Sequence, residues 1–179
     1  MFPDGRTARI FAKIILMTLT THAVVGVAAA RLFPQMPVTA FLAGFCSHFL
    51  IDAIPHWDYH LRSAKYDVSN PLNNDMIIGS DFVFDLSKIL FDFIFAYWLS
   101  FWIFSGDSRG VIFVGASAGM LPDALQFAYF KIRREPLISL QRFHQWIHTG
   151  KKLREQWIFG IVSQIMLSAA IIFLSFAIK

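Results

Sequence analysis

One stretch of an apolar helical segment carries imidazole and carboxylate side chains of the types that bind metal ions. His48 and Asp52 are four residues apart, so on a helix they lie on one face, one turn from each other. Pro55 then ends the helix, and His56 and Asp58 follow in the loop. Unpaired polar groups in an apolar segment are unfavourable, and a divalent metal is the partner that suits neutral imidazole together with carboxylate.

Similar residues recur near the ends of other apolar segments. The further candidate ligands are His22, Asp81, Asp85, Asp123, His144 and His148. His144 and His148 have the spacing of a helical metal-binding pair. Imidazole and carboxylate ligands together predict a divalent metal such as zinc.

Each of these signals also has a structural interpretation. His48 and Asp52 could form a hydrogen-bonded pair, and His22 could bond a backbone carbonyl or a threonine of a neighbouring helix. On an exposed basic helix, His144 and His148 could form a solvated pair. A structural ion seam could explain the acids of the third helix, and we assign Asp92 and Lys88 to it.

Composition predicts an integral membrane protein. Apolar residues make up 56% of the 179 residues, against roughly 45–50% in a soluble domain. The net charge is +4, but the basic residues flank apolar runs, which argues against a nucleic-acid partner. Cys46 is the only cysteine, so no disulfide can form within the chain. The N-terminal apolar run is longer than a signal peptide's and is interpreted as a retained helix.

The pattern of apolar runs predicts an all-α fold: one membrane domain, 1–179, built as a bundle of about five transmembrane helices with a cytoplasmic amphipathic helix. The predicted spans are 14–33, 38–54, 80–104, 111–130 and 156–178, and the amphipathic helix is 136–149. The segment 56–79 is expected to be a loop with little structure of its own. Gly115 and Gly119 predict a close helix contact, and Pro122 is expected to kink or break its helix.

Charge and topology predict where the polar groups lie. With five spans, most basic residues fall on one side, so the positive-inside rule places the N-terminus in the cytoplasm. The protein is then a multi-pass protein of the inner membrane. His22, the His48–Asp52 pair, the acids that begin the third helix and Asp123 all fall within roughly 12 Å of the cytoplasmic face at ~1.5 Å per residue. Four helices therefore bring polar groups to one depth.

Three motifs resemble the bacterial integral-membrane metal-dependent hydrolase family, which is distantly similar to zinc-dependent phospholipase C. They are Thr21-His22-x-x-x-Gly26, Ser47-His48-x-x-x-Asp52-x-x-Pro55-His56 and Gly115-x-x-x-Gly119-x-x-Pro122-Asp123. The resemblance implies that His22, His48, Asp52 and Asp123 are metal ligands. The His-Arg-Gly-x-Thr-His stretch typical of some members is missing, and His144 and His148 are the candidates that stand in for it.

These observations predict metal-dependent hydrolysis of a phosphoester or lipid-like substrate at the cytoplasmic face. Asp85 or Asp58 is the expected general base. The basic residues Arg133, Arg134, Lys151 and Lys152 would attract an anionic phospholipid headgroup. Two alternatives use the same residues: a small transporter that relays protons or binds a cation in transit, and a scaffold whose polar seam only fixes helix pairing.

Overall fold

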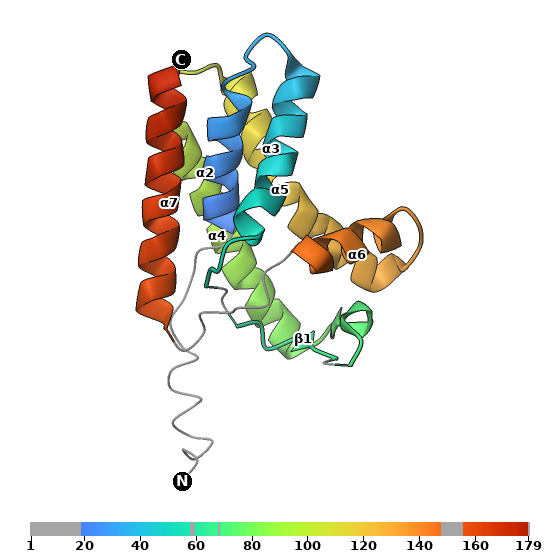
Figure 1. Ribbon diagram of the computed structural model, residues 1–179. Helices are drawn as coiled ribbons and strands as arrows, with labels where there is room; N and C mark the ends of the chain where they lie inside the picture. Colours follow the sequence, from blue (N-terminus) through green and yellow to red (C-terminus); the bar gives the residue numbers. More distant parts are fainter. Residues whose placement is uncertain (1–18, 58–59, 68, 148–155, 179) are drawn as a thin grey trace.

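The computed structural model describes residues 19–57, 60–67, 69–147 and 156–178, which form a helical bundle with one small strand pair (Figure 1). The helices of these residues are α2 (Leu19–Ala30), α3 (Pro37–Asp52), α4 (Ser80–Ile103), α5 (Arg109–Ile132), α6 (Leu137–Ile147) and α7 (Trp157–Ile178). The predicted all-α class is confirmed for this part of the chain.

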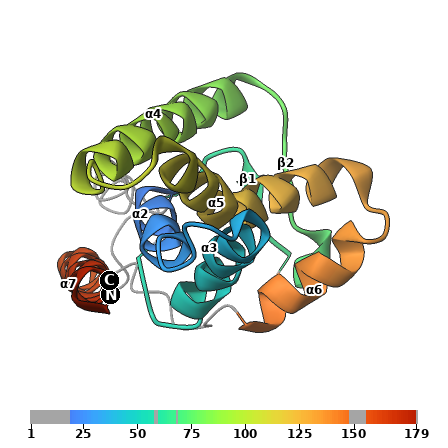
Figure 2. The ribbon, with the colours of Figure 1, turned by 90° about the horizontal axis from the view of Figure 1, so that it is seen from above.

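Helix α2 is the centre of the bundle although it is short. Viewed from above, α3, α4, α5 and α7 lie around it (Figure 2). Every residue of α2 except Ala29 is buried. Its sequence is rich in alanine, valine and glycine, and these small side chains let four neighbours approach one helix.

Glycines bring α2, α3 and α5 into backbone contact. A methyl group added to Gly119 would overlap the carbonyl oxygen of His22, and one added to Gly115 would lie 2.7 Å from the Cα of Val27. A methyl group on Gly44 of α3 would lie 3.1 Å from the carbonyl oxygen of Gly115. The predicted small-residue contact face on α5 is therefore confirmed, and it holds the polar residues of three helices close together.

Two of the five predicted spans satisfy the length and composition expected of a membrane span. These are Arg109–Ile132 and Ile158–Ile178, with 44% and 11% of their apolar windows buried inside the protein. Helix α3 has 16 residues, whereas a span needs about 20. Helix α2 has 12 described residues, and residues 14–18 of the first predicted span lie outside the described part of the chain. The prediction of five spans is thus supported for two helices.

The segment between α3 and α4 is more ordered than expected. Strand β1 (Ala64–Lys65) pairs antiparallel with β2 (Asp75–Met76), and the 3₁₀ helix η1 (Pro71–Asn73) lies between them. Asp67 accepts hydrogen bonds from the hydroxyl of Ser69 and the side-chain amide of Asn73, which hold its pKa well below the usual value. Most of the described part of segment 56–79 has no regular secondary structure, as predicted, and side-chain hydrogen bonds such as those of Asp67 order part of it.

Pro122 lies inside α5 without ending it. The helix runs unbroken from Arg109 to Ile132. The predicted break is therefore wrong, and Asp123 lies within a helix rather than at the start of a second one. Buried residues of α5 on both sides of Pro122, from Val111 to Tyr129, hold the helix in place by packing.

Candidate metal centre

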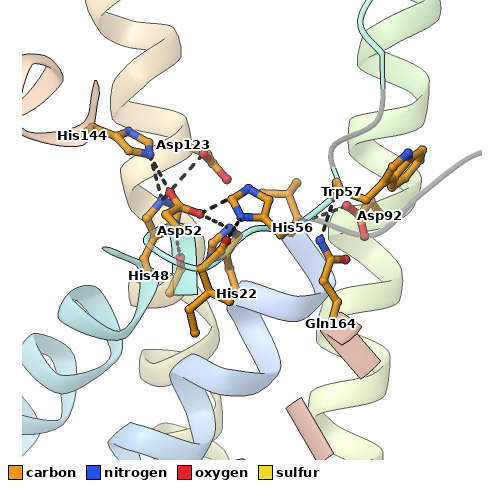
Figure 3. Close-up of polar contacts among 12 residues, drawn as sticks. His22, His48, Asp52, His56, Trp57, Asp92, Asp123, His144 and Gln164 are labelled. Carbon is orange, nitrogen blue, oxygen red and sulfur yellow. Dashed lines mark hydrogen bonds and ion pairs between the residues drawn. The ribbon is translucent and has the colours of Figure 1, made fainter. Parts of the chain in front are cut away.

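The carboxylate of Asp52 lies among imidazoles from three other parts of the chain and from its own helix (Figure 3). One oxygen, Oδ2, is 2.8 Å from Nε2 of His144 and 3.1 Å from Nε2 of His48. The other, Oδ1, is 3.3 Å from Nε2 of His22 and 4.0 Å from Nε2 of His56. We call Asp52, His22, His48 and His144 the Asp52 cluster; His56 lies at its edge.

All four members of the Asp52 cluster are buried, with exposed fractions of 5% or less. They come from α2, α3 and α6, so residues more than 90 positions apart in sequence meet at one point. Burial of ionisable groups in an apolar bundle is unfavourable unless they are paired or coordinate a metal. The bundle therefore retains these groups for their chemistry or for mutual pairing.

Helix α5 fixes the orientation of His48. Nδ1 of His48 lies 2.9 Å from the carbonyl oxygen of Gly119. Because a carbonyl oxygen can only accept, Nδ1 carries the proton and donates the hydrogen bond. In the neutral ring, Nε2 then presents a lone pair toward Oδ2 of Asp52. Two acceptors 3.1 Å apart repel each other unless a cation, either a proton or a metal ion, lies between them. Donation of the other ring N–H to a backbone carbonyl is the usual arrangement of a metal-binding histidine.

His56 shows the same arrangement. Its Nδ1 donates to the carbonyl oxygen of Ile54 at 2.8 Å, which leaves Nε2 facing Asp52. This local bond uses the turn that follows α3. His56 is therefore half-buried beside the Asp52 cluster, with Nε2 on the side of the Asp52 carboxylate.

The three nearest atoms form a triangle of the size that a tetrahedral zinc site requires. Nε2 of His48 and Nε2 of His144 are 3.3 Å apart, and their distances to Oδ2 of Asp52 are 3.1 and 2.8 Å. Ligand bonds of about 2.0–2.1 Å place neighbouring tetrahedral ligands roughly 3.3 Å apart. His48, Asp52 and His144 could therefore hold a metal ion.

A second group overlaps the first at His48. It contains His22, His48 and Asp123, whose ligand atoms lie within 4.8 Å of one another. The rings of His22 and His48 stack with centroids 3.9 Å apart. Nδ1 of His22 is buried and has no hydrogen-bond partner among the described residues. Asp123 is 3.8 Å from Nε2 of His48, and its side chain is 33% exposed, so it lies at the open edge of the site.

Asp81 and Asp85 are not brought into the cluster. Asp81 is exposed at the start of α4. Asp85 is buried, accepts hydrogen bonds from the backbone and the hydroxyl of Ser63 at 2.8 Å, and pairs with Lys88 at 2.7 Å. These bonds anchor the β1 segment to α4. The other two candidates, Asp58 and His148, lie outside the described residues.

The predicted ion pair between Asp92 and Lys88 is wrong. Asp92 instead accepts hydrogen bonds from the backbone N–H groups of Leu19 and Thr20 at 3.0 and 3.2 Å, and from the Thr20 hydroxyl at 2.6 Å. A carboxylate at the first residues of α2 satisfies backbone donors that have no partner within the helix. Asp92 is therefore a cap that holds α4 against the start of α2.

His144 is buried, whereas the alternative interpretation placed it in a solvated pair on an exposed basic helix. The buried residues of α6 are Gln141 and His144, whereas Phe143 and Trp146 are 42% and 79% exposed. The polar face of α6 therefore packs on the protein, and its aromatic face points outward. The solvated interpretation of His144 is wrong, because the helix lies against the end of α3 rather than alone.

Gly119 is a contributor that the sequence did not reveal as part of the site. Its spacing from Gly115 indicated helix packing only. In the structure its carbonyl oxygen also orients His48. The available signal was its position one turn before Asp123, which places the two on one face of α5.

Two cavities border the cluster. The larger has a volume of about 700 Å³ and is lined by His22, Asp52, Asp123 and His144 together with residues of α4, α5 and the strand pair. The smaller, about 90 Å³, lies beside His22, Asp52 and His56 and reaches Gln164 of α7.

The arrangement can therefore hold a cation at the wall of a cavity large enough for a ligand, since binding sites typically measure about 300–1,000 Å³. A partly exposed carboxylate, Asp123, lies where the cluster meets that cavity. Comparisons of the chain with protein-family models, with curated proteins and with solved structures give no match.

Proposed function

We propose that this chain is a membrane-embedded, metal-dependent hydrolase that cleaves a phosphoester or lipid-like substrate at the cytoplasmic face of the inner membrane. The observation that carries the proposal is the lone pair of His48, fixed by the Gly119 carbonyl, facing the Asp52 carboxylate and His144 within 3.3 Å. In the neutral His48 ring, Nε2 and the Asp52 carboxylate are both acceptors, and Nε2 of His144 lies within 3.3 Å of both.

The proposed ligands are His48, Asp52 and His144, and His22 and Asp123 lie beside them. Imidazole and carboxylate ligands at these separations suit zinc, and a site with three protein ligands leaves a position open for substrate. A bound divalent ion acts as a Lewis acid on a phosphoryl oxygen and lowers the pKa of a bound water.

Asp123 is the proposed general base in place of Asp85. It lies 3.8 Å from His48 at the edge of the large cavity, whereas Asp85 is bonded to Ser63 and Lys88. In the reaction, the oxygen of a water molecule bonds to phosphorus and the P–O bond to the leaving alcohol breaks. Asp123 takes the proton from the water and returns it to the leaving oxygen.

The membrane location is supported by the two helices that meet the span criterion and by the outward aromatic face of α6. Trp146 and Phe143 on that face suit the interface between headgroups and acyl chains. The exposed basic residues Arg133 and Arg134 lie just before α6. They suit attraction of an anionic headgroup, worth about 1 kcal/mol each near an anionic surface.

The test combines metal content with activity. The full chain, purified in detergent, is analysed for bound zinc, manganese and iron, and is then assayed with bis(p-nitrophenyl) phosphate. We expect about one ion per chain at the three-ligand site, with both metal and activity lost in His48→Ala. The matched control is His60→Ala, because His60 is an exposed histidine outside the cluster. If the purified wild type contains no metal and His48→Ala behaves as the wild type does, the Asp52 cluster has only a structural role.

A second candidate function is cation handling. The small cavity and the large one share His22 and Asp52, so the cluster separates two hollows as an ion-binding gate would. Zinc uptake into proteoliposomes that depends on Asp52, in protein without hydrolytic activity, would favour this function. Hydrolysis without uptake would favour the enzyme.

A further inference from the structure

The large cavity extends far beyond the Asp52 cluster. Its lining on α4 includes Phe82, Leu86, Ile89, Phe93 and Tyr97. These positions recur at intervals of three or four residues, so they lie along one face of the helix. We call the space that they line, between α4 and α5, the α4–α5 slot.

The opposite wall of the slot comes from α5. Ser117, Met120, Leu121, Ala124 and Phe127 line it, again at intervals that keep one helical face. From Phe82 to Tyr97 the slot follows 15 residue-to-residue steps of α4, which is about 22 Å at 1.5 Å per residue. The slot is therefore longer than the hydrocarbon depth of one bilayer leaflet, which is about 15 Å.

Contacts between the two helices limit the slot near both ends. The hydroxyl groups of Tyr97 and Ser117 are hydrogen bonded at 2.6 Å. Toward the other end, the rings of Phe82 and Phe127 stack with centroids 5.7 Å apart. Between these contacts the side chains lining the slot are largely apolar, and Leu86 and Phe93 are 47% and 42% exposed. The slot is therefore accessible from the side, as a chain arriving from the bilayer requires.

The polar and apolar parts of the cavity are continuous. His22, Asp52, Asp123 and His144 line the same cavity as the apolar residues of the slot. One ligand could thus place a polar group at the cluster and an apolar chain between α4 and α5. A compact soluble metabolite at the cluster would contact little of this apolar wall.

We propose that the α4–α5 slot binds the hydrocarbon chain of the substrate, an amphiphile with one long chain and a phosphoester head that lies at the Asp52 cluster. The proposal rests on the proposed function for the identity of the head. The slot itself is a binding site whose evidence is independent of the metal: its length, its apolar lining and its lateral opening. A saturated chain and an isoprenoid chain are both single apolar chains, and either source of the substrate would place such a chain in the slot.

The first experiment varies chain length. The wild-type chain in detergent is assayed with alkyl p-nitrophenyl phosphodiesters that carry ethyl, hexyl, dodecyl or farnesyl groups. Because each buried methylene favours binding about fourfold, we expect kcat/KM to rise at least tenfold from ethyl to dodecyl. Equal rates for the ethyl and dodecyl esters would overturn the slot and leave the hydrolase intact. Comparison of dodecyl with farnesyl distinguishes the two chain sources.

Two leucines of α4 supply a matched pair of variants. Leu86 lines the slot and Leu90 does not, and they are 47% and 54% exposed, so each tolerates a larger side chain. Leu86→Trp is expected to reduce the rise in kcat/KM from the ethyl to the dodecyl ester to less than twofold, because the indole would occupy the space of the chain. Leu90→Trp is expected to behave as the wild type. If Leu86→Trp and Leu90→Trp show the same dependence of kcat/KM on chain length, the proposal is overturned.

Photolabelling separates failure of the slot from failure of the proposed function, because it needs no catalysis. The probe is dodecyl phosphate with a terminal diazirine, competed with unlabelled dodecyl phosphate. We expect competed labels on the residues of α4 and α5 that line the slot, such as Ile89, Phe93 and Leu121, with loss in Leu86→Trp. Labels on the outer face around Leu90 and Ile94 that resist competition would overturn the slot. Competed labels in a protein that cleaves no ester would retain the slot and reject the hydrolase.

Discussion

The two ends of α2 carry buried charged groups of opposite character. At one end His22 belongs to the Asp52 cluster; at the other, Arg31 follows directly after the helix. Nε of Arg31 donates to Asp107 at 2.7 Å, and Nη1 donates to the carbonyl oxygen of Ser175 at 2.6 Å. The guanidinium also lies 3.9 Å from the ring centroid of Phe176. This end joins α2, the turn between α4 and α5, and the end of α7.

The difference lies in how donors and acceptors are matched. Around Arg31 each contact joins a donor to an acceptor or a cation to an aromatic face, which is the pattern of a structural tie. Around Asp52, a histidine lone pair fixed by Gly119 meets a carboxylate, and Nδ1 of His22 is buried without a hydrogen-bond partner among the described residues. Equal burial therefore has two meanings: the Arg31 end is complete as it stands, and the Asp52 end has ligand atoms that could hold a cation.

The largest effect on stability is expected from Arg31→Met. Removing one member of a buried ion pair typically costs about 3–5 kcal/mol, so thermal unfolding in detergent should occur at a markedly lower temperature. Metal content per folded chain should be unchanged, because Arg31 contacts none of the cluster residues in the described structure. The control is Arg109→Met at an exposed arginine. A loss of metal from folded Arg31→Met protein would end the distinction between the two regions.

Metal removal is the second prediction. An ion present at 100–1,000 times its Kd stabilises a protein by roughly 2.7–4.1 kcal/mol. Chelation with EDTA should therefore lower the unfolding temperature of the wild type and of Arg31→Met, but not that of His48→Ala. An unchanged wild-type unfolding temperature after chelation would indicate that protons alone hold the cluster together.

Gly119→Ala should affect packing and the site together. The added methyl group overlaps the carbonyl oxygen of His22, so α2 and α5 must separate, at a cost of about 1–3 kcal/mol. Because the Gly119 carbonyl orients His48, metal affinity should also fall, by about 10–100-fold. Gly110→Ala is the control, since a methyl group there meets nothing within 4 Å. Both quantities come from thermal unfolding and zinc titration.

The smallest effect is expected at the strand pair, β1 and β2. Lys131 donates to Asp75 at 2.8 Å and also to the carbonyl oxygen of Met76, and the first bond lowers the pKa of Asp75. A lowered carboxyl pKa stabilises the fold above the unfolded value of about 3.9, and this contribution is lost as pH falls through the folded pKa. Lys131→Met should therefore cost less than about 1 kcal/mol at pH 7.

The control for that variant is Arg134→Met, an exposed basic residue of the same region. Unfolding at pH 7 and at pH 3 should show a difference between Lys131→Met and the wild type that shrinks at the lower pH. If the difference in stability between Lys131→Met and the wild type is larger at pH 3 than at pH 7, the Asp75 carboxylate is not the group through which Lys131 stabilises the fold.

Sequence alone determined the helical class, the close contact at Gly115 and Gly119, and the importance of His48 and Asp52, because periodicity and spacing within one helix are local properties. It did not determine which distant residues join them. Asp81, Asp85 and His144 looked equally suitable as ligands, yet only His144 reaches Asp52, and Asp85 is bonded to Ser63 and Lys88 instead.

Tertiary structure decided these choices through packing. The way that α6 lies against α3 buries His144, and the approach of α2 to α5 at Gly119 sets both the stacking of His22 and the tautomer of His48. A residue's type fixes what chemistry it can perform. Its partners depend on how whole helices fit together, and no local spacing encodes that fit.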